Sequence, residues 1–348
     1  MSSPGVDAKI TVAGKPAAVL FGCKGLSLSA EETAFFADVN PFGFILFARN
    51  VENPGQVRAL VAALRACVGR DDAPVLIDQE GGRVQRLRPP HWRQAPAAAE
   101  IAAIGPKAGE AAYLNARLIG RELAELGVSV DCAPVLDVAR GETHAIIGDR
   151  AYSGDPATVA MFGRAICDGL RAEAVHPVIK HIPGHGRARA DSHLELPRVG
   201  ASYEELKALD FAPFAALKDE DWAMTAHIVY DEIDPEAPAT CSRAMIEGII
   251  RDDIGFSGLL MSDDLSMKAL TGDFDDRARA ALEAGCDMVL HCNGEMDEMK
   301  SVTKGIGELS HVALERFAAA EARRAKAKAE AEPIATAELL ARFQALMG

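Results

Sequence analysis

Short apolar runs recur along the chain, and each is followed by a longer stretch that mixes apolar and polar residues. Short runs of this kind are typical of strands buried in a parallel sheet, and the longer stretches have the length of helices. The expected strands are residues 17–21, 44–47, 75–77, 128–132, 175–179, 223–225, 259–261 and 288–290. The expected helices between them are residues 30–39, 55–68, 106–126, 156–174, 203–217, 243–252 and 276–284.

Strands that alternate with helices predict an α/β protein with a parallel sheet. Eight such units predict a single (β/α)8 TIM-like barrel. An open doubly wound sheet is the alternative, but no GxGxxG motif follows the first strand to support it. No low-complexity linker divides the chain, so we expect residues 1–348 to form one catalytic domain.

The end of the chain has a different composition. Residues 311–332 are rich in Ala, Glu, Lys and Arg, which favours a solvated helix. Pro333 interrupts this pattern, and residues 334–347 have the spacing of a short amphipathic helix. We therefore expect residues 311–348 to form a C-terminal helical tail that packs on the barrel.

Polar side chains gather where the predicted strands end. In a barrel these ends meet at one mouth, where active sites lie. This recurrence predicts a site more strongly than any single residue does. The residues are Asp78, Asp137, Lys180, His181, His227, Asp263 and His291.

Net charge and cysteine usage narrow the functional classes. The net charge of -14 argues against nucleic acid as a partner, because phosphate binding needs a basic surface. Seven scattered cysteines without a CxxC pair indicate reduced thiols. The N-terminal residues lack the pattern of a signal peptide, and no apolar run has the length of a membrane span. We expect a cytoplasmic protein with no membrane partner.

The stretch KHIPGHGRARADSHLELP, residues 180–197, has the densest concentration of reactive side chains. Asp191 stands two residues before His193 and could orient its ring for proton transfer. A histidine on a surface loop beside a carboxylate is the simpler reading, and the nearby Lys180, His181 and His185 favour a site instead. Zinc is a weak alternative, since the histidine spacings match no compact metal motif.

Two further motifs leave their roles open. Asp263 and Asp264 follow the seventh strand, where one carboxylate could be a nucleophile and the other could cap the next helix. Asp78 and Arg86 belong to DQEGGRVQR, which could grip sugar hydroxyls or form a tight turn with a solvated ion pair. Arg150 could reach a substrate, but the sequence favours a pair with the adjacent Asp149.

Together, KHIPGHGRARADSH, DQEGGRVQR, APVLDV with IGDR, MTAHIVY and MSDDLSM closely resemble the family 3 glycoside hydrolases. Among these the chain is similar to the bacterial cytoplasmic β-N-acetylhexosaminidases, from about residue 21 to residue 291. The resemblance implies that Asp263 is the nucleophile and His193 the general acid/base, oriented by Asp191. It also implies binding of N-acetylglucosamine by Asp78, Arg86, Arg150, Lys180 and His181.

The resemblance implies a retaining β-N-acetylglucosaminidase that releases terminal β-linked N-acetylglucosamine from muropeptide or anhydro-muropeptide fragments in peptidoglycan recycling. It implies no metal and no organic cofactor, and we expect a monomer. Phosphorolysis or β-glucosidase activity within the same family is the alternative. A metal-dependent amidohydrolase and a catalytically silent sugar-binding barrel are alternatives from other classes, and the latter would need no nucleophile.

Overall fold

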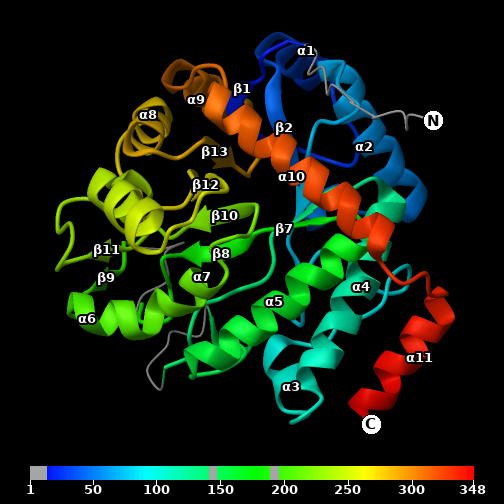
Figure 1. The fold of residues 1–348 in the computed structure, drawn as a ribbon. Coiled ribbons are helices and arrows are strands. Elements are labelled where there is room, and N and C mark those ends of the chain that lie inside the picture. The colour runs from blue at the N-terminus through cyan, green and yellow to red at the C-terminus, as the bar shows by residue number, and fades with distance from the viewer. Residues whose placement is uncertain (1–13, 141–146, 189–195) are drawn as a thin grey trace, which may run out of the picture.

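The computed structural model describes residues 14–140, 147–188 and 196–348. In these residues nine parallel strands form a nearly closed barrel (Figure 1). The hydrogen-bonded order is β7-β6-β3-β2-β1-β13-β12-β10-β8. The strands are β1 Ala17–Gly22, β2 Pro41–Leu46, β3 Val75–Ile77, β6 Val130–Asp131, β7 His176–Pro177, β8 Ile179–Ile182, β10 Trp222–Thr225, β12 Leu259–Asp264 and β13 Met288–His291.

The barrel confirms the predicted fold class. Strands β7 and β8 stand at opposite ends of the order but are separated in the chain by Val178 alone. They therefore occupy the place of a single predicted strand, and each of the eight apolar runs contributes one position to the barrel. The nine-strand order and the expected eight-unit barrel thus describe the same architecture.

Helices surround this barrel. They are α1 Ala30–Val39, α2 Pro54–Val68, α3 Ala98–Ala102, α4 Ala108–Leu126, α5 Pro156–Ala172, α6 Tyr203–Glu205, α7 Ala212–Ala216, α8 Phe274–Ala284, α9 Met296–Val302, α10 His311–Glu330 and α11 Thr336–Met347. The predicted helix 203–217 is wrong as one regular element, because a π-helical segment, Leu206–Asp210, separates α6 from α7. Pro213 lacks a backbone N–H, which breaks the regular ladder there. The predicted helix 243–252 is also π-helical, over Ala244–Asp253.

The core has two layers because side chains alternate along each strand. In β1, Ala18 and Leu20 belong to the cluster that fills the barrel. Val19 and Phe21 belong to the larger cluster between the strands and the surrounding helices. The walls of the barrel are therefore apolar on both faces, as is expected for a parallel sheet.

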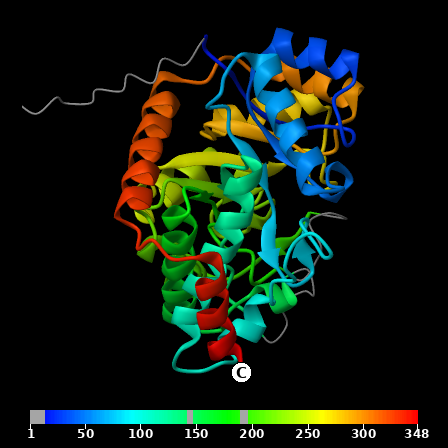
Figure 2. The ribbon, with the colours of Figure 1, turned by 90° about the vertical axis from the view of Figure 1, so that its right-hand side faces the viewer.

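Helix α10 closes one end of the barrel. Phe317 packs against Phe42 and Trp222, with ring centroids 5.0 and 6.2 Å away. Phe42 and Trp222 lie at the amino ends of β2 and β10, so α10 covers the amino end of the barrel. Figures 1 and 2 show α10 crossing this end, while α11 returns along α4. The prediction of a solvated helix is therefore wrong for one face, where Ala313, Phe317 and Ala320 are buried.

Within the part of the chain that the structure describes, no helix is long and apolar enough to span a membrane. All seven cysteines are free thiols.

Candidate active site

A cavity of about 260 Å³ opens at the carboxyl ends of the barrel strands, opposite α10. Its wall brings together residues that lie far apart in the sequence, as the polar strand ends predicted. Apolar side chains of Ile45, Phe47, Met224 and Leu290 complete the wall. The predicted site residues that line the cavity are Asp78, Arg86, Arg150, Lys180, His181 and Asp263.

Asp78 is the centre of a partly buried ionic cluster. Its carboxylate accepts a hydrogen bond from Lys180 Nζ at 2.8 Å and another from Arg86 Nη2 at 2.9 Å. Arg86 is also held by the ring of Phe47, 5.2 Å from the guanidinium carbon. Burial alone would raise the pKa of Asp78, but the two cations outweigh it and hold that pKa well below its usual range. The carboxylate is therefore ionised and rigidly placed, suited to accept hydrogen bonds from a polyhydroxylated ligand.

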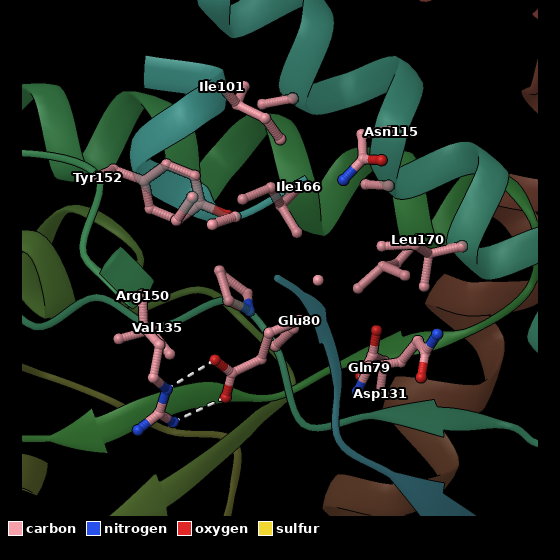
Figure 3. A pocket seen from close by; sticks show the side chains of 18 of the residues that line it. Gln79, Glu80, Ile101, Asn115, Asp131, Val135, Arg150, Tyr152, Ile166 and Leu170 are labelled. Carbon is pink, nitrogen blue, oxygen red and sulfur yellow. Dashed lines mark hydrogen bonds and ion pairs between the residues drawn. The ribbon is translucent and has the colours of Figure 1, made fainter. Parts of the chain in front are cut away.

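Glu80 joins the same cluster, and the sequence did not single it out. Arg150 donates two hydrogen bonds to its carboxylate, at 2.7 and 2.8 Å (Figure 3). Lys180 Nζ lies 2.7 Å from Oε1 of the same carboxylate. Glu80 follows Asp78 at the two-residue period of an extended chain, which is the signal that could have revealed it. The predicted pair of Arg150 with Asp149 is wrong, because Asp149 accepts instead from Arg83 Nε at 2.8 Å.

The ion pairs within the cluster outweigh the effect of burial on the pKa values of its members. Burial would raise the pKa of Glu80, but Arg150 and Lys180 lower it to about 2. Burial would lower the pKa of Lys180, but Asp78 and Glu80 raise it above its usual range. Asp78, Glu80 and Lys180 are therefore charged at neutral pH. Three cations face two carboxylates here, so the cluster favours an electron-rich ligand.

The backbone between Asp78 and Arg86 makes a hairpin of β4, Gln79–Gly81, and β5, Val84–Gln85. Gly82 at its turn has a φ of +55°, and a Cβ added there would lie 2.8 Å from the Cβ of Ala97. Glycine is needed at this position for both reasons. The turn returns the chain so that Arg86 meets Asp78.

Asp263 and Asp264 have different roles, but the expected helix cap is wrong, because the next helix, α8, has Asp273 at its N-cap position. Asp264 caps the turn after β12, since it accepts hydrogen bonds from Ser266 N at 3.0 Å and Cys292 N at 3.1 Å. Its own N–H donates to Asp263 Oδ1 at 2.8 Å. Asp263 is thus a strand-end carboxylate on the cavity wall, oriented by the next residue of the chain.

Asp137 organises the histidines beside the cavity. Its Oδ2 lies 2.7 Å from His181 Nδ1, and its Oδ1 accepts from the backbone N–H of His185 at 2.6 Å. Burial would raise the pKa of Asp137, but His181 lowers it to about 2. Burial lowers the pKa of His185 to about 4, although Asp137 opposes this. His185 is therefore neutral at physiological pH, while His181 keeps a fixed ring orientation.

Asp191 and His193 fall outside the described residues. Three of the predicted histidines are described but do not line the cavity. His176 lies at the amino end of the barrel, 2.6 Å from Glu321 of α10, so it cannot share a site with His181. His227 and His291 are buried and are not part of the cavity wall. In the described ranges no group of three or more His, Cys, Asp or Glu side chains could hold a metal ion. The expected absence of a metal stays a prediction.

Residues 9–326 match the family model described as the glycosyl hydrolase family 3 N terminal domain. The chain is 43% identical over 272 residues to a β-hexosaminidase of Pseudomonas aeruginosa, covering 77% of this chain and 80% of the relative. It is 42% identical over 278 residues to a β-hexosaminidase of Methylococcus capsulatus, covering 79% and 82%.

A crystal structure of NagZ from Neisseria gonorrhoeae in complex with N-trifluoroacetyl-D-glucosamine is similar over the whole barrel. The TM-score is 0.85 at 32% identity, with 96% of this chain and 99% of that chain covered. The sequence comparison and the structural comparison therefore both place the chain among the family 3 glycosyl hydrolases.

Proposed function

Because the chain belongs to glycosyl hydrolase family 3 and is a glycoside hydrolase of the β-N-acetylhexosaminidase type, we propose that it is a retaining β-N-acetylglucosaminidase. We propose that it removes terminal β-linked N-acetylglucosamine from muropeptide or anhydro-muropeptide fragments. One observation carries the proposal: the Asp263 carboxylate shares a single cavity with the ionic cluster of Asp78, Arg86 and Lys180.

The cluster supplies the sugar-binding half of the proposed site. The Asp78 carboxylate can accept hydrogen bonds from two adjacent hydroxyls of a sugar ring, and Arg86 and Lys180 can donate to their oxygens. Arg150 and His181 extend this polar wall. Because the cluster is prearranged by its own ion pairs, little side-chain freedom would be lost when the sugar binds.

Asp263 supplies the proposed nucleophile. In a retaining mechanism the ionised carboxylate attacks C1 and forms a covalent glycosyl-enzyme, which water then hydrolyses. The N–H of Asp264 stabilises the charged form of the Asp263 carboxylate by donating to Oδ1. We propose that His193, oriented by Asp191, protonates the leaving oxygen in the first step and activates water in the second.

The proposed setting is peptidoglycan recycling in the cytoplasm. The seven free cysteines support a reducing compartment. We further propose that the enzyme acts as a monomer and needs no cofactor. Retained turnover after dialysis against a chelator would separate it from a metal-dependent amidohydrolase on the same barrel.

Turnover of a nitrophenyl β-N-acetylglucosaminide tests the nucleophile. We expect Asp263→Ala and Asp263→Asn to lower kcat by roughly 10³-fold or more, as removal of a nucleophile does in other covalent mechanisms. Asp168→Asn is the matched control, because Asp168 pairs with Arg171 on α5 and lies outside the cavity wall. Wild-type rates in both Asp263 variants, with the fold intact by circular dichroism, would end the assignment.

The acid/base role of His193 has a separate test. A nitrophenyl leaving group needs little protonation, so His193→Ala should still form the covalent intermediate but release it slowly. Intact-mass spectrometry during turnover should then show protein carrying one N-acetylglucosaminyl group. With poorer leaving groups the rate should fall by about 10²–10⁴-fold, the usual contribution of a general acid. If His193→Ala shows no added mass and no slower rate than the wild type, His193 is not the general acid/base.

Two variations of this activity have distinct products. Phosphorolysis would use the same covalent intermediate with phosphate as the acceptor, and would give N-acetylglucosamine 1-phosphate in phosphate buffer. A β-glucosidase would prefer the nitrophenyl β-glucoside. Product analysis with and without phosphate, on both substrates, separates these two from hydrolysis of an N-acetylglucosaminide.

A further inference from the structure

Three side chains outside the cavity wall lie against the backbone that carries Asp263. Thr225 is the last residue of β10, His227 lies two residues after it, and Thr240 belongs to a 3-10 turn, Ala239–Cys241. All three are fully buried, with 0% exposure. Buried polar groups must be hydrogen-bonded to be tolerated, so their partners show what they hold in place.

The partners of His227 fix its tautomer. Its Nε2 lies 3.0 Å from the carbonyl oxygen of Asp264, and a carbonyl only accepts, so Nε2 carries the hydrogen. Burial lowers the pKa of His227, so the ring is neutral and Nδ1 is an acceptor. The hydroxyl of Thr240 lies 2.7 Å from Nδ1 and therefore donates to it.

These contacts also determine where the Thr225 hydroxyl directs its hydrogen. Thr240 Oγ1 lies 2.8 Å from Thr225 Oγ1 and, because its hydrogen is directed to His227, it accepts the Thr225 hydrogen. Thr225 Oγ1 in turn accepts the backbone N–H of Asp263 at 3.3 Å. The carbonyl oxygen of Ala226 is also within reach of the Thr240 hydroxyl, at 3.1 Å, but it is farther away than His227 Nδ1 at 2.7 Å. We therefore direct the Thr240 hydrogen to His227.

The result is a chain of four hydrogen bonds in one direction. It starts at the N–H of Asp263, passes through Thr225, Thr240 and His227, and ends at the carbonyl of Asp264. The chain therefore holds both residues at the end of β12. Asp264 is also the residue whose N–H orients Asp263 Oδ1.

We propose that Thr225, Thr240 and His227 are positioning residues for Asp263, and that this relay holds its carboxylate in line with the anomeric carbon of the bound sugar. The inference rests on the proposed role of Asp263 as the nucleophile. None of the three side chains touches the cavity, so losing the relay should impair attack more than binding.

Thr240 offers the cleanest test, because it is the middle of the relay. Thr240→Val keeps the shape of the side chain and removes the hydroxyl, whereas Thr240→Ser keeps the hydroxyl. We expect Thr240→Val to lower kcat by about 10- to 100-fold, since a displacement of about 1 Å can cost on the order of 10²-fold. The inhibition constant of the product N-acetylglucosamine should change by less than about twofold, and Thr240→Ser should retain most of the wild-type kcat.

The controls keep this proposal separate from the proposed function. Absent turnover in the wild-type enzyme would count against the function itself. An active wild type with equal kcat in folded Thr240→Val and Thr240→Ser would overturn the relay, as would a loss of kcat matched by an equal loss of product binding. If Thr240→Val does not fold, the pair Thr225→Val and Thr225→Ser is compared by the same two constants.

Discussion

At the scale of single residues, Glu80 orients the side chains of two cations in the site, Arg150 and Lys180. Glu80 makes three of the ion-pair contacts in the cluster, to Arg150 and Lys180, and its own exposure is small. A buried carboxylate between two cations fixes their geometry as well as their charge. The cations that Glu80 holds are the ones we propose to bind the sugar.

We expect Glu80→Gln to raise KM about tenfold, equivalent to about 1.4 kcal/mol of binding free energy. The amide keeps the shape but removes the charge that orients Arg150 and Lys180, whereas Asp263 is untouched, so kcat should change less than KM. Steady-state kinetics on the nitrophenyl substrate measures both. Asp149→Asn is the control, because its pair with Arg83 is exposed and such pairs contribute little. An unchanged KM would show that Glu80 does not support binding.

At the scale of secondary-structure elements, α10 closes the amino end of the barrel, a role that its charged composition does not predict. Its exposed face is charged, but Ala313, Phe317 and Ala320 follow one another at helical spacing and enter the amino end of the barrel. The barrel interior would otherwise open to water below Phe42 and Trp222. The helix therefore completes the core and does not contribute to the cavity at the opposite end.

Phe317→Ala should lower the free energy of unfolding by roughly 3–5 kcal/mol, the usual cost of deleting a buried aromatic ring. Val312→Ala on the same helix is the control, because Val312 is 52% exposed and its loss should cost less than about 0.5 kcal/mol. Urea denaturation measures both variants. Turnover by folded Phe317→Ala should match the wild type, and a large loss of kcat would contradict a purely structural role.

At the scale of the whole molecule, buried carboxylates make stability depend on pH in opposite directions. Asp137 and Glu80 have pKa values lowered to about 2, so their stabilisation is present above the unfolded value near 4 and is lost as the pH falls toward 2. Asp131 differs, because burial raises its pKa to about 7, against the hydrogen bond from Gln79 N. Its Oδ2 is buried without a hydrogen-bond partner, at a small cavity that Asn115 also lines (Figure 3).

The folded protein therefore binds a proton at Asp131 more tightly than the unfolded chain does, and its stability should fall as the pH rises from about 4 to 7. The loss is on the order of a few kcal/mol, at about 1.4 kcal/mol for each unit of pKa. Asp131→Asn keeps an oxygen for Gln79 N and cannot ionise. We expect the difference in unfolding free energy between pH 5 and pH 8 to be smaller in Asp131→Asn than in the wild type. Equal differences would show that Asp131 is not responsible.

The sequence by itself determined the barrel, the position of its strands and six of the polar residues that line the cavity. These follow from local patterns: apolar runs of strand length, helical spacing between them, and polar residues shortly after several of the runs. Asp78, Lys180 and Asp263 meet because parallel strands bring their carboxyl ends to one mouth, which needs no further detail of packing.

Only the tertiary structure decided which charges pair and which helix face is buried. The sequence favoured Asp149 as the partner of Arg150, but the fold gives Arg150 to Glu80, far away in the chain. Contact between neighbours in sequence is easy to foresee, whereas electrostatic energy depends on distance and burial, which the fold sets. For the same reason the composition of α10 predicted a fully solvated helix. Only the fold shows that Phe317 packs into the amino end of the barrel.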